Sequence, residues 1–557
     1  MNKSDYMAKA NAITANYEEV TRNPTNKTEA TTKRVIKETL DGKMSDNIIQ
    51  ALLPQSSRTA ELYGLPKDHK PGVPLRPIVS ACGDPLDKVS QLLEKILSQL
   101  LKFVPAHLCN TDEYLRRLSD KYPGYMFPAG SIVFSVDVTN LYGNIPYQEA
   151  IECAKRLLET HHQDIDMLGL DILDVTHLLS HCLSNNFLRF GDKYYRQTSG
   201  IAMGSRVAPP LAIIFMDSLE RQFNSTAATK PDIYMRYIDD VLGVWTNGAE
   251  NLHRYLQHIN DAHPSIRFTI ETTENSDSIP FLDTELTVEP SGKYTTELYI
   301  KPTSAGIILH ADSAQPWKTK RAVLHSQTRR AIRLSSNEDA RKRSIKRVKD
   351  LFTNNGYNSK TISTAINTCV TLTPQARSRR KKPVARMVLP FIDDHLSNVV
   401  QAVIRGSDQQ DLGVTWTNGY TIKNQLVRSA LKPPPCPGGA RCHACAAGLQ
   451  GRCHTSGVVY QLTCTICKKT YIGETGRMVR LRYNEHLRDA KNKRVDSPWG
   501  THFNDEHHNY QPDPKCITAK ILQVCNSERD RKIAESLYIR DNRPKLNINI
   551  ASWAIMG

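Results

Sequence analysis

The sequence predicts a multidomain protein of mixed α+β structure, and three observations lead to this fold class. With 557 residues the chain is too long for one hydrophobic core, so about two to four domains are expected. Between about residues 56 and 310, apolar runs that suit strands alternate with helical patterns. Six of the thirteen cysteines lie between Cys436 and Cys467, which sets the C-terminal part apart from the rest. We therefore expect several domains, with a metal-binding module at the C-terminal end.

Shifts in composition divide the chain into five segments. Residues 1–55 are polar and are expected to form a helical extension, and residues 56–310 form the main α+β domain. Residues 311–372 have the pattern of basic helices. Residues 373–435 are expected to be a linker region, because they begin with TPQARSRRKKP and end with three consecutive prolines. The remainder, 436–557, is expected to be a compact second domain.

The charge of the chain indicates a polyanionic partner. Its formal net charge is +16. Residues 311–350 hold twelve Lys/Arg against four Asp/Glu, and six more basic residues lie between Arg377 and Arg386 with no acidic residue among them. A solvated basic surface would explain either run alone. Two such runs beside one domain favour nucleic acid, whose phosphates are neutralised by clusters of this kind.

No feature of the sequence indicates a membrane partner. No segment approaches the roughly 18 apolar residues that a membrane span needs. The first twenty residues, MNKSDYMAKANAITANYEEV, lack the apolar core of a signal peptide. We therefore expect a soluble intracellular protein with reduced cysteines.

Two apolar segments of the main domain carry aspartates. Residues 131–138 (SIVFSVDV) suit a buried strand, yet Asp137 lies near its end. Residues 233–245 (IYMRYIDDVLGVW) suit two short strands joined by a turn centred on Asp239 and Asp240. An ordinary hairpin would explain the second segment alone. A buried carboxylate, however, needs a cation. Three carboxylates can hold two divalent ions about 4 Å apart. Such a pair of ions activates a 3′-hydroxyl and stabilises the leaving pyrophosphate.

On these residues the chain resembles the reverse transcriptases, which are RNA-dependent DNA polymerases with a right-hand fold. The Tyr-Ile-Asp-Asp box, the upstream Asp137 and the order of the motifs carry the resemblance. It implies that residues 56–310 are fingers and palm and that residues 311–372 are a thumb. It also implies that Asp137, Asp239 and Asp240 are catalytic and hold two Mg²⁺ ions, for which Mn²⁺ can substitute. The implied partners are an RNA template and dNTPs.

The same resemblance implies a nucleotide-binding site. The segment DVTNLY matches the first palm motif, which makes Tyr142 a steric gate against a ribose 2′-hydroxyl; a core tyrosine is the alternative. Residues 200–209 (GIAMGSRVAP) match a glycine-containing motif, with Met203 where retroviral enzymes have glutamine. Residues 64–79 (GLPKDHKPGVPLRPIV) match the fingers motifs, although a solvated basic loop would look similar. The implied nucleotide-binding residues are Lys67, Lys70, Arg76, Val138, Tyr142, Met203 and Gly204.

The C-terminal segment contains a second group of chemically active residues. Residues 457–473 (GVVYQLTCTICKKTYIG) suit two strands, and a helical stretch follows in which Arg482 and His486 share one face. A basic amphipathic helix would show the same pattern. The spacing resembles the GIY-YIG endonucleases, although the first triplet here is Val-Val-Tyr and lacks the glycine. The implied nuclease residues are Tyr460, Tyr471, Arg482, His486, Glu535 and Asn547.

The types of these residues make nuclease chemistry intelligible. A Mg²⁺ ion on Glu535 would polarise the phosphate, and Arg482 would stabilise developing negative charge. A tyrosine hydroxyl would orient or deprotonate water. The sequence leaves open whether Tyr460 or His486 is the general base.

The spacing of cysteines and histidines predicts one or two structural Zn²⁺ sites. Cys464 and Cys467 have the spacing of a zinc knuckle, and His502 with His508 forms a suitable second pair, with His507 as a substitute for His508. Buried free thiols are the alternative. The other predicted ligand set is Cys436, Cys442 and Cys445, with Cys453 as the fourth ligand.

A reverse transcriptase followed by a GIY-YIG nuclease with a Cys-Cys-His-His finger resembles the Penelope-like retroelement proteins, over nearly the whole chain from about residue 35. The resemblance implies target-primed reverse transcription in the nucleus: the nuclease nicks duplex target DNA, and the exposed 3′-hydroxyl primes copying of the element RNA. An intron-type maturase, which a splicing assay would reveal, and a domesticated RNA-binding protein without catalysis are the alternatives. The intact catalytic residues favour an enzyme.

Overall fold

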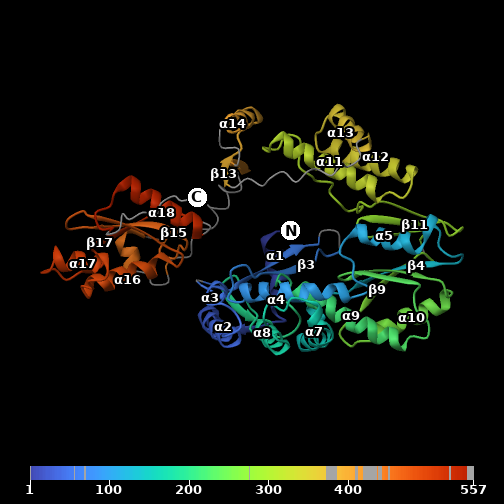
Figure 1. The fold of residues 1–557 in the computed structure, drawn as a ribbon, viewed down its shortest axis with the longest axis horizontal. Coiled ribbons are helices and arrows are strands. Elements are labelled where there is room, and N and C mark those ends of the chain that lie inside the picture. Colours follow the sequence, from blue (N-terminus) through green and yellow to red (C-terminus); the bar gives the residue numbers. More distant parts are fainter. Residues whose placement is uncertain are drawn as a thin grey trace. The chain divides into compact units, whose positions relative to one another are not determined.

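The computed structural model describes residues 2–55, 57–67, 71–274, 276–371, 385–407, 412–417, 436, 442–449, 452–525 and 528–547 (Figure 1). The chain forms two compact units, residues 1–419 and residues 420–557. The division falls inside the predicted linker region, sixteen residues before its expected end at residue 435.

A four-stranded antiparallel sheet forms the palm of the first unit, with β4 and β8 at its centre. In order across the sheet its strands are β7 (Ile233–Tyr237), β8 (Asp240–Trp245), β4 (Ile132–Val138) and β9 (Phe268–Thr272). Figure 1 shows α9 and α10 on one side of this sheet and α5 with β11 on the other. The helices of the palm and around it are α4 (Asp87–Leu100), α5 (Thr111–Lys121), α6 (Leu141–Asn144), α7 (Tyr147–His161), α8 (Ile172–Ser184), α9 (Ala208–Thr226) and α10 (Ala249–Asp261).

A five-stranded mixed sheet forms the fingers, and the N-terminal segment is part of it. Its strands, in order across the sheet, are β1 (Glu18–Val20), β6 (Lys193–Arg196), β5 (Phe187–Phe190), β2 (Ala60–Pro66) and β3 (Leu75–Ser80). Residues 1–55, expected to be a helical extension, contain the helices α1 (Lys3–Thr14), α2 (Thr25–Leu40) and α3 (Asp46–Leu52). They also contain β1, which the sequence analysis did not predict and which pairs with β6.

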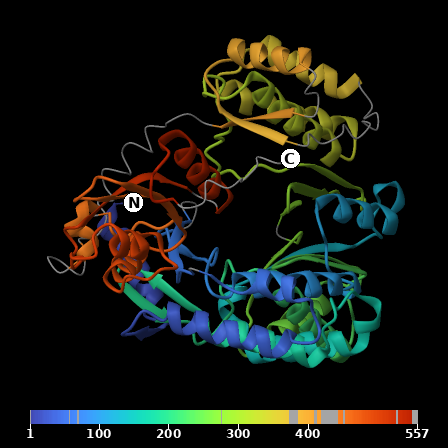
Figure 2. The ribbon, with the colours of Figure 1, turned by 60° about the vertical axis from the view of Figure 1, so that its left-hand side comes forward.

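Three helices follow a small antiparallel sheet at the end of the palm. The sheet consists of β10 (Ser278–Phe281), β11 (Thr284–Val288) and β12 (Tyr294–Leu298). The helices α11 (Trp317–Leu334), α12 (Glu338–Asn354) and α13 (Ser359–Thr371) occupy the segment predicted as basic helices, and Figure 2 shows them gathered in one bundle. Leu298 of β12 belongs to the same core cluster as Leu324 and Phe352, so this bundle packs against the small sheet.

The predicted linker region contains regular structure in its described part. β13 (Ala385–Pro390) and β14 (Leu412–Thr417) pair in parallel, and α14 (Asp394–Gly406) lies between them in the sequence. The linker region was predicted from the charged and proline-rich residues at its ends. The β-branched and aromatic residues of the two strands favour β structure, and the prediction did not use them.

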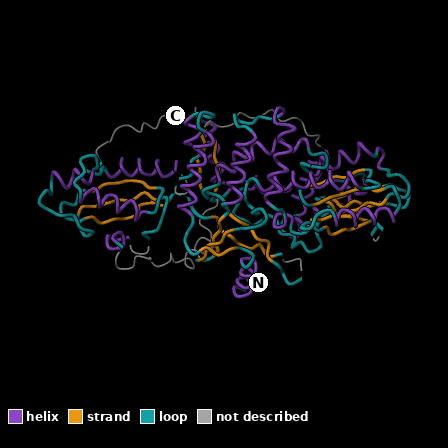
Figure 3. The backbone as a smooth tube through the Cα atoms, turned by 90° about the horizontal axis from the view of Figure 1, so that it is seen from below, coloured by secondary structure: helices purple, strands orange, loops and turns teal. Residues whose placement is uncertain are grey.

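The second unit is a three-stranded antiparallel sheet flanked by helices (Figure 3). The strand order is β16 (Thr470–Thr475), β15 (Val458–Cys464) and β17 (Ile517–Val524). Its helices are a π-helical turn, η5 (Cys445–Leu449), and α16 (Val479–Lys491), α17 (Pro498–Asp505) and α18 (Glu528–Asn542). Within the described residues of the chain, none of the helices is both long and apolar enough to span a membrane.

Candidate active sites and metal centres

The three predicted palm aspartates meet at one end of the palm sheet. Asp137 on β4 and Asp240 on β8 are direct cross-strand partners, and Asp239 lies in the tight turn between β7 and β8. In that turn Ile238 has a left-handed φ of 58°. The backbone N–H of Val138 donates to the carbonyl oxygen of Asp239 at 3.2 Å, which fixes the turn against β4.

The alternation of side chains along the strands puts two of these carboxylates on the same face. Val136 and Val138 on β4 and Val241 on β8 belong to the large core cluster that the helices cover. Successive side chains of a strand point to opposite faces. Asp137 and Asp240 therefore point away from that core, and both residues are exposed.

The pKa values of the aspartates reflect their closeness. Burial, followed by the charges of Asp239 and Asp137, raises the pKa of Asp240 to about 6. Burial and then Asp137 also raise the pKa of Asp239, although Arg76 and Lys67 lower it. Neighbouring carboxylates resist ionising together unless a cation neutralises them. The donor set therefore fits divalent ions such as Mg²⁺, which prefer carboxylate oxygens.

Of the predicted nucleotide-binding residues of the palm, Tyr142 lies beside Asp239, and Val138 lies in the core. Burial and then the charge of Asp239 raise the pKa of Tyr142 to about 12, so the two side chains are neighbours. The carbonyl oxygen of Tyr142 accepts a hydrogen bond from the N–H of Ile201 at 2.7 Å, which joins the first palm motif to the glycine-containing loop. Val138 is only 3% exposed, so its side chain belongs to the core and cannot contact a nucleotide.

The glycine-containing loop is fixed against the fingers. The carbonyl oxygen of Met203 accepts from the N–H of Val79 on β3 at 2.8 Å. Gly204 has a φ of 125°, and a Cβ atom there would lie 2.1 Å from the carbonyl oxygen of Val79. Only glycine fits so close to the neighbouring backbone. Met203 contributes its backbone to this junction.

The basic residues of the fingers lie on the β2–β3 hairpin. Arg76 is on β3, and the N–H of Lys67 donates to the carbonyl oxygen of Pro74 at 2.8 Å. Because Arg76 and Lys67 both lower the pKa of Asp239, their charges act on the aspartate site. Lys70 lies outside the described residues.

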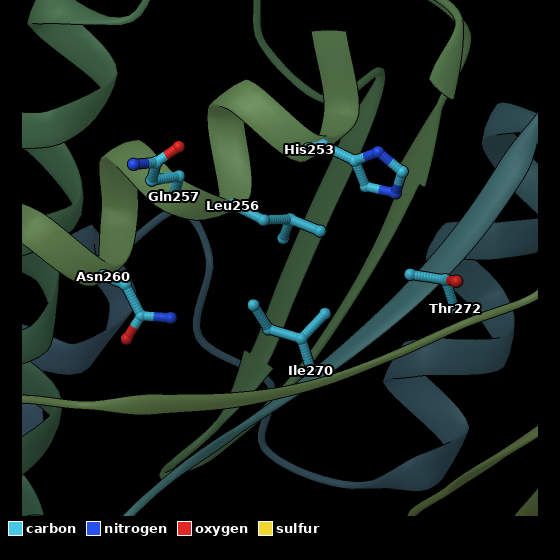
Figure 4. Close-up of a pocket in the computed structure, with 6 residues that line it drawn as sticks. All are labelled: His253, Leu256, Gln257, Asn260, Ile270 and Thr272. Atoms are coloured by element: carbon cyan, nitrogen blue, oxygen red, sulfur yellow. The ribbon is translucent and has the colours of Figure 1, made fainter. Parts of the chain in front are cut away.

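A pocket in the palm is separate from this site. Figure 4 shows it between α10 and β9, with Leu256 and Gln257 on the helix and Ile270 and Thr272 on the strand. Thr269 directly precedes Ile270, so it points to the other face of β9 from Ile270 and Thr272, and it is the cross-strand partner of Asp137. The pocket therefore lies on the opposite face of the sheet from the aspartates.

In the second unit, predicted nuclease residues from three elements form one cluster. The hydroxyl of Tyr460 on β15 shares a hydrogen bond of 2.8 Å with Nε2 of His486 on α16. Nε of Arg482 donates to the same hydroxyl at 3.3 Å. The ring of Tyr471 on β16 lies edge-on to His486, with 5.2 Å between centroids.

The burial of these residues separates them into two kinds. Tyr460 is 1% exposed and His486 is 2% exposed, whereas Tyr471 and Arg482 are partly exposed. Burial and then Arg482 lower the pKa of His486 to about 3, which keeps the imidazole neutral. Burial also raises the pKa of Tyr460 and Tyr471. Tyr471 and Arg482 are therefore more accessible from solvent than Tyr460 and His486, which are the two candidates that the sequence gives for the general base.

Glu535 faces this cluster from α18. Burial and then the neighbouring Glu474 raise the pKa of Glu535 to about 7, while Arg482 and Arg531 lower it. Glu474 forms an ion pair with Arg531, which lies one helical turn before Glu535. Neither Glu474 nor Arg531 was predicted from the sequence as a site residue. A signal was available, because Glu474 directly follows the Tyr-Ile-Gly triplet.

Two further predicted features hold strand β16 in place. The side chain of Asn547 accepts from the N–H of Ile472 at 3.0 Å and donates to its carbonyl oxygen at 2.7 Å. Asn547 therefore fixes the strand that carries Tyr471. A Cβ atom at Gly473 would lie 2.7 Å from the hydroxyl of Tyr460, so the glycine of this triplet lets the two tyrosines approach each other.

The first predicted zinc set assembles with one correction. The ligand atoms of Cys464, Cys467, His502 and His507 all lie within 4.8 Å of one another. His507 takes the place predicted for His508, because the chain after α17 turns the ring of His507 to 4.8 Å from that of His502. The backbone of His508 instead accepts a hydrogen bond from Lys493.

The second predicted set also comes together. The sulfur atoms of Cys436, Cys442, Cys445 and Cys453 lie within 4.8 Å of one another, with Cys453 buried. All thirteen cysteines are free thiols, so neither set is a pair of disulfides. Both sets have the ligand number and types of a structural Zn²⁺ site.

Comparisons with known proteins bear on the first unit. Residues 69–273 match the family model described as reverse transcriptase (RNA-dependent DNA polymerase). Residues 307–367, which include α11 and α12, match the animal helix-turn-helix domain. The match to the first model includes the three palm aspartates, so the chain contains a reverse transcriptase domain. No curated protein matches the chain.

Several solved polymerase structures are similar to the chain at low identity. Telomerase from Candida albicans, in complex with the TWJ fragment of telomeric RNA, is 13% identical, with 61% of this chain and 59% of that chain covered and a TM-score of 0.39. Apo telomerase from Candida tropicalis is 10% identical, with 62% of each chain covered and a TM-score of 0.37. The RNA-dependent RNA polymerase of BmCPV is 11% identical, with 59% and 29% covered and a TM-score of 0.35. The chain spans less than two thirds of each of these proteins.

Proposed function

We propose that this protein is a retroelement enzyme of the Penelope-like type, which nicks duplex DNA and copies the element RNA from the exposed 3′-hydroxyl, in the nucleus. The observation that carries the polymerase part is the pairing of Asp137 with Asp240 at the end of the palm sheet, with Asp239 in the adjoining turn, inside a reverse transcriptase domain. The nuclease and the retroelement setting rest on the second unit, where Tyr460, Arg482 and Glu535 surround one position.

In the polymerase site the three aspartates would hold two Mg²⁺ ions, which activate the primer hydroxyl and stabilise pyrophosphate. Arg76 and Lys67 supply positive charge opposite Asp239, where the triphosphate of a dNTP would bind. Tyr142 lies beside Asp239 and would fill the space that a ribose 2′-hydroxyl requires. RNA template affinity would come mainly from Lys and Arg contacts to phosphates.

In the nuclease site Glu535 would hold one Mg²⁺ ion, which polarises the scissile phosphate. Arg482 donates toward the site and would stabilise negative charge on the phosphate in the transition state. We assign the orientation of the attacking water to Tyr471, because this residue is partly exposed whereas Tyr460 and His486 are buried. On this view Tyr460 and His486 hold Arg482 and the two strands in position.

Two Zn²⁺ ions would stabilise the second unit without taking part in the reaction. One would be held by Cys464, Cys467, His502 and His507, and the other by Cys436, Cys442, Cys445 and Cys453. The first set ties the end of β15 to α17, and the second brings residues on both sides of η5 together. Structural zinc contributes directly to the free energy of folding.

A target-primed reaction tests the proposal as a whole. Wild-type protein is incubated with supercoiled plasmid, an RNA template, dNTPs and Mg²⁺, and labelled cDNA joined to plasmid is measured. We expect joined product with wild type, and none with Glu535→Gln, which should still extend a supplied primer because its palm is intact. Equal nicking by both proteins, or none by either, would contradict the nuclease assignment. Activity in a splicing assay would favour the maturase alternative.

A further inference from the structure

The N-terminal helix α1 contacts the hairpin that carries the basic residues of the nucleotide site. The backbone N–H of Gly64 on β2 donates to the hydroxyl of Tyr6 at 2.8 Å. The ammonium group of Lys9 donates to the carbonyl oxygen of Val73 at 2.8 Å and also to that of Gly72. Tyr6 and Lys9 are three residues apart on α1, so they project from the same face of the helix. One helix face thus contacts the hairpin both in β2 and in the turn before β3.

The remainder of α1 is anchored to the fingers, so these contacts come from a fixed element. Ala10 is 2% exposed. Ile13 packs against the fingers core cluster that contains Leu62 and Val79, one residue from each strand of the hairpin. The helix is also capped, because the side chain of Asn2 accepts the N–H of Asp5 at 2.9 Å.

The carbonyl groups that Lys9 holds lie next to the attachment of Lys67. Gly72 and Val73 directly precede Pro74, whose carbonyl oxygen accepts the N–H of Lys67. Gly72 has a φ of 72° and Val73 a φ of 45°. A left-handed conformation is unfavourable for a β-branched residue such as valine and persists only where neighbouring contacts hold it. The two hydrogen bonds from Lys9 are contacts of this kind.

We propose that α1 is a positioning element of the nucleotide site, in which Tyr6 and Lys9 hold the β2–β3 hairpin so that Lys67 and Arg76 stay opposite Asp239. The inference rests on the proposed polymerase function, since an incoming dNTP is the ligand whose binding depends on the hairpin. Tyr6 and Lys9 act through the hairpin backbone, whereas Lys67 and Arg76 would contact the triphosphate. A misplaced hairpin should weaken dNTP binding and leave the metal-bound aspartates unaffected.

Steady-state primer extension on an RNA template tests this inference with Tyr6→Phe and Lys9→Met. Each variant removes one hydrogen-bonding group from α1 while keeping the size of the side chain. We expect the KM for dNTP to rise about five- to tenfold, because a lost hydrogen bond of this kind is worth about 1 kcal/mol. The kcat and the Kd for primer–template should stay at the wild-type values. Lys3→Met is the matched control, since Lys3 is exposed on the same helix.

The outcomes separate this inference from the proposed function. A KM for dNTP equal to that of wild type in both variants would overturn it. A fall in kcat together with a lower melting temperature, absent in Lys3→Met, would also overturn it, because that is the effect of a role in folding alone. If the wild-type protein shows no Mg²⁺-dependent extension, the proposed polymerase function fails and this inference fails with it.

Discussion

The palm site and the proposed nuclease site bring their acidic groups into place in different ways. In the palm, Asp137 and Asp240 are partners on directly paired strands, so the backbone register alone brings them together. In the second unit, Glu535 comes from α18 and faces residues of β15, β16 and α16, and the buried Tyr460 and His486 connect these elements. A site built by strand register should tolerate side-chain changes without loss of the fold. A site built by packed side chains should lose stability and activity together.

The largest effect is expected for Asp239→Asn. Loss of one ligand of the two-metal site should lower primer extension by about three orders of magnitude or more, while RNA binding stays nearly intact. If register alone builds this site, the melting temperature should be unchanged. Extension rates, RNA mobility shifts and thermal melting measure the three effects. Asp192→Asn is the control, because Asp192 is fully exposed in the fingers; normal extension by Asp239→Asn would contradict the palm assignment.

Arg482→Ala should remove both activity and packing from the nuclease site. We expect nicking of supercoiled plasmid to fall by about 10²- to 10³-fold, as for other groups that stabilise transition-state charge. The second unit should also lose about 1–3 kcal/mol of stability, because Tyr460 and Glu485 lose a partner. Arg488→Ala, an exposed arginine on the same helix, is the control. Loss of nicking with no loss of stability would break the contrast drawn between the two sites.

Removal of one zinc ligand tests whether bound zinc stabilises the second unit. His507→Ala should reduce the bound zinc from two ions per chain to one and lower the melting temperature of the second unit. His508→Ala should keep both ions, because His508 lies outside the ligand set. Cys464→Ser with Cys467→Ser should reproduce the effect of His507→Ala. Metal analysis of freshly purified reduced protein measures the stoichiometry, and a protein without zinc would refute the hypothesis.

The smallest change in overall rate is expected for Tyr142→Ala. Removing the ring beside Asp239 should open space for a ribose 2′-hydroxyl, so ribonucleotides should be incorporated about ten- to a hundredfold more readily relative to dNTPs. DNA synthesis itself should persist, because the aspartates are unchanged. Competition between matched dNTP and rNTP on one template measures the ratio. Unchanged discrimination would show that Tyr142 only fills the core.

Much of the palm site could be predicted from local patterns. The apolar runs around Asp137 and around Asp239 and Asp240 became β4, β7 and β8, because strand propensity and turn chemistry are set by neighbouring residues. The alternation of β4 places the side chain of Val138, a predicted nucleotide-binding residue, in the core. The family resemblance identified Val138 as part of the motif. Only the orientation of β4 showed that its side chain lies on the core-facing side of the palm sheet.

The proposed nuclease site was less accessible to sequence reasoning. The resemblance named Tyr460, Arg482, His486 and Glu535, but it did not predict how deeply each is buried. Their burial is the reason why we propose Tyr471 as the residue that orients water. Glu474 and Arg531 were missed, since their ion pair joins a strand to a helix more than fifty residues later. The contacts of α1 with the fingers hairpin were missed for the same reason, as Lys9 and Val73 are 64 residues apart.

The sequence by itself determined the strands that carry the palm aspartates, the cysteine spacing of both metal sets and the basic helices after the palm. These features depend on periodicity, turn residues and composition, which act over a few neighbouring residues. Only the tertiary structure decided between His507 and His508, between buried and accessible tyrosines, and between a free N-terminal extension and one held to the fingers. Each of these depends on how elements distant in the chain pack, and packing is a property of the whole folded core.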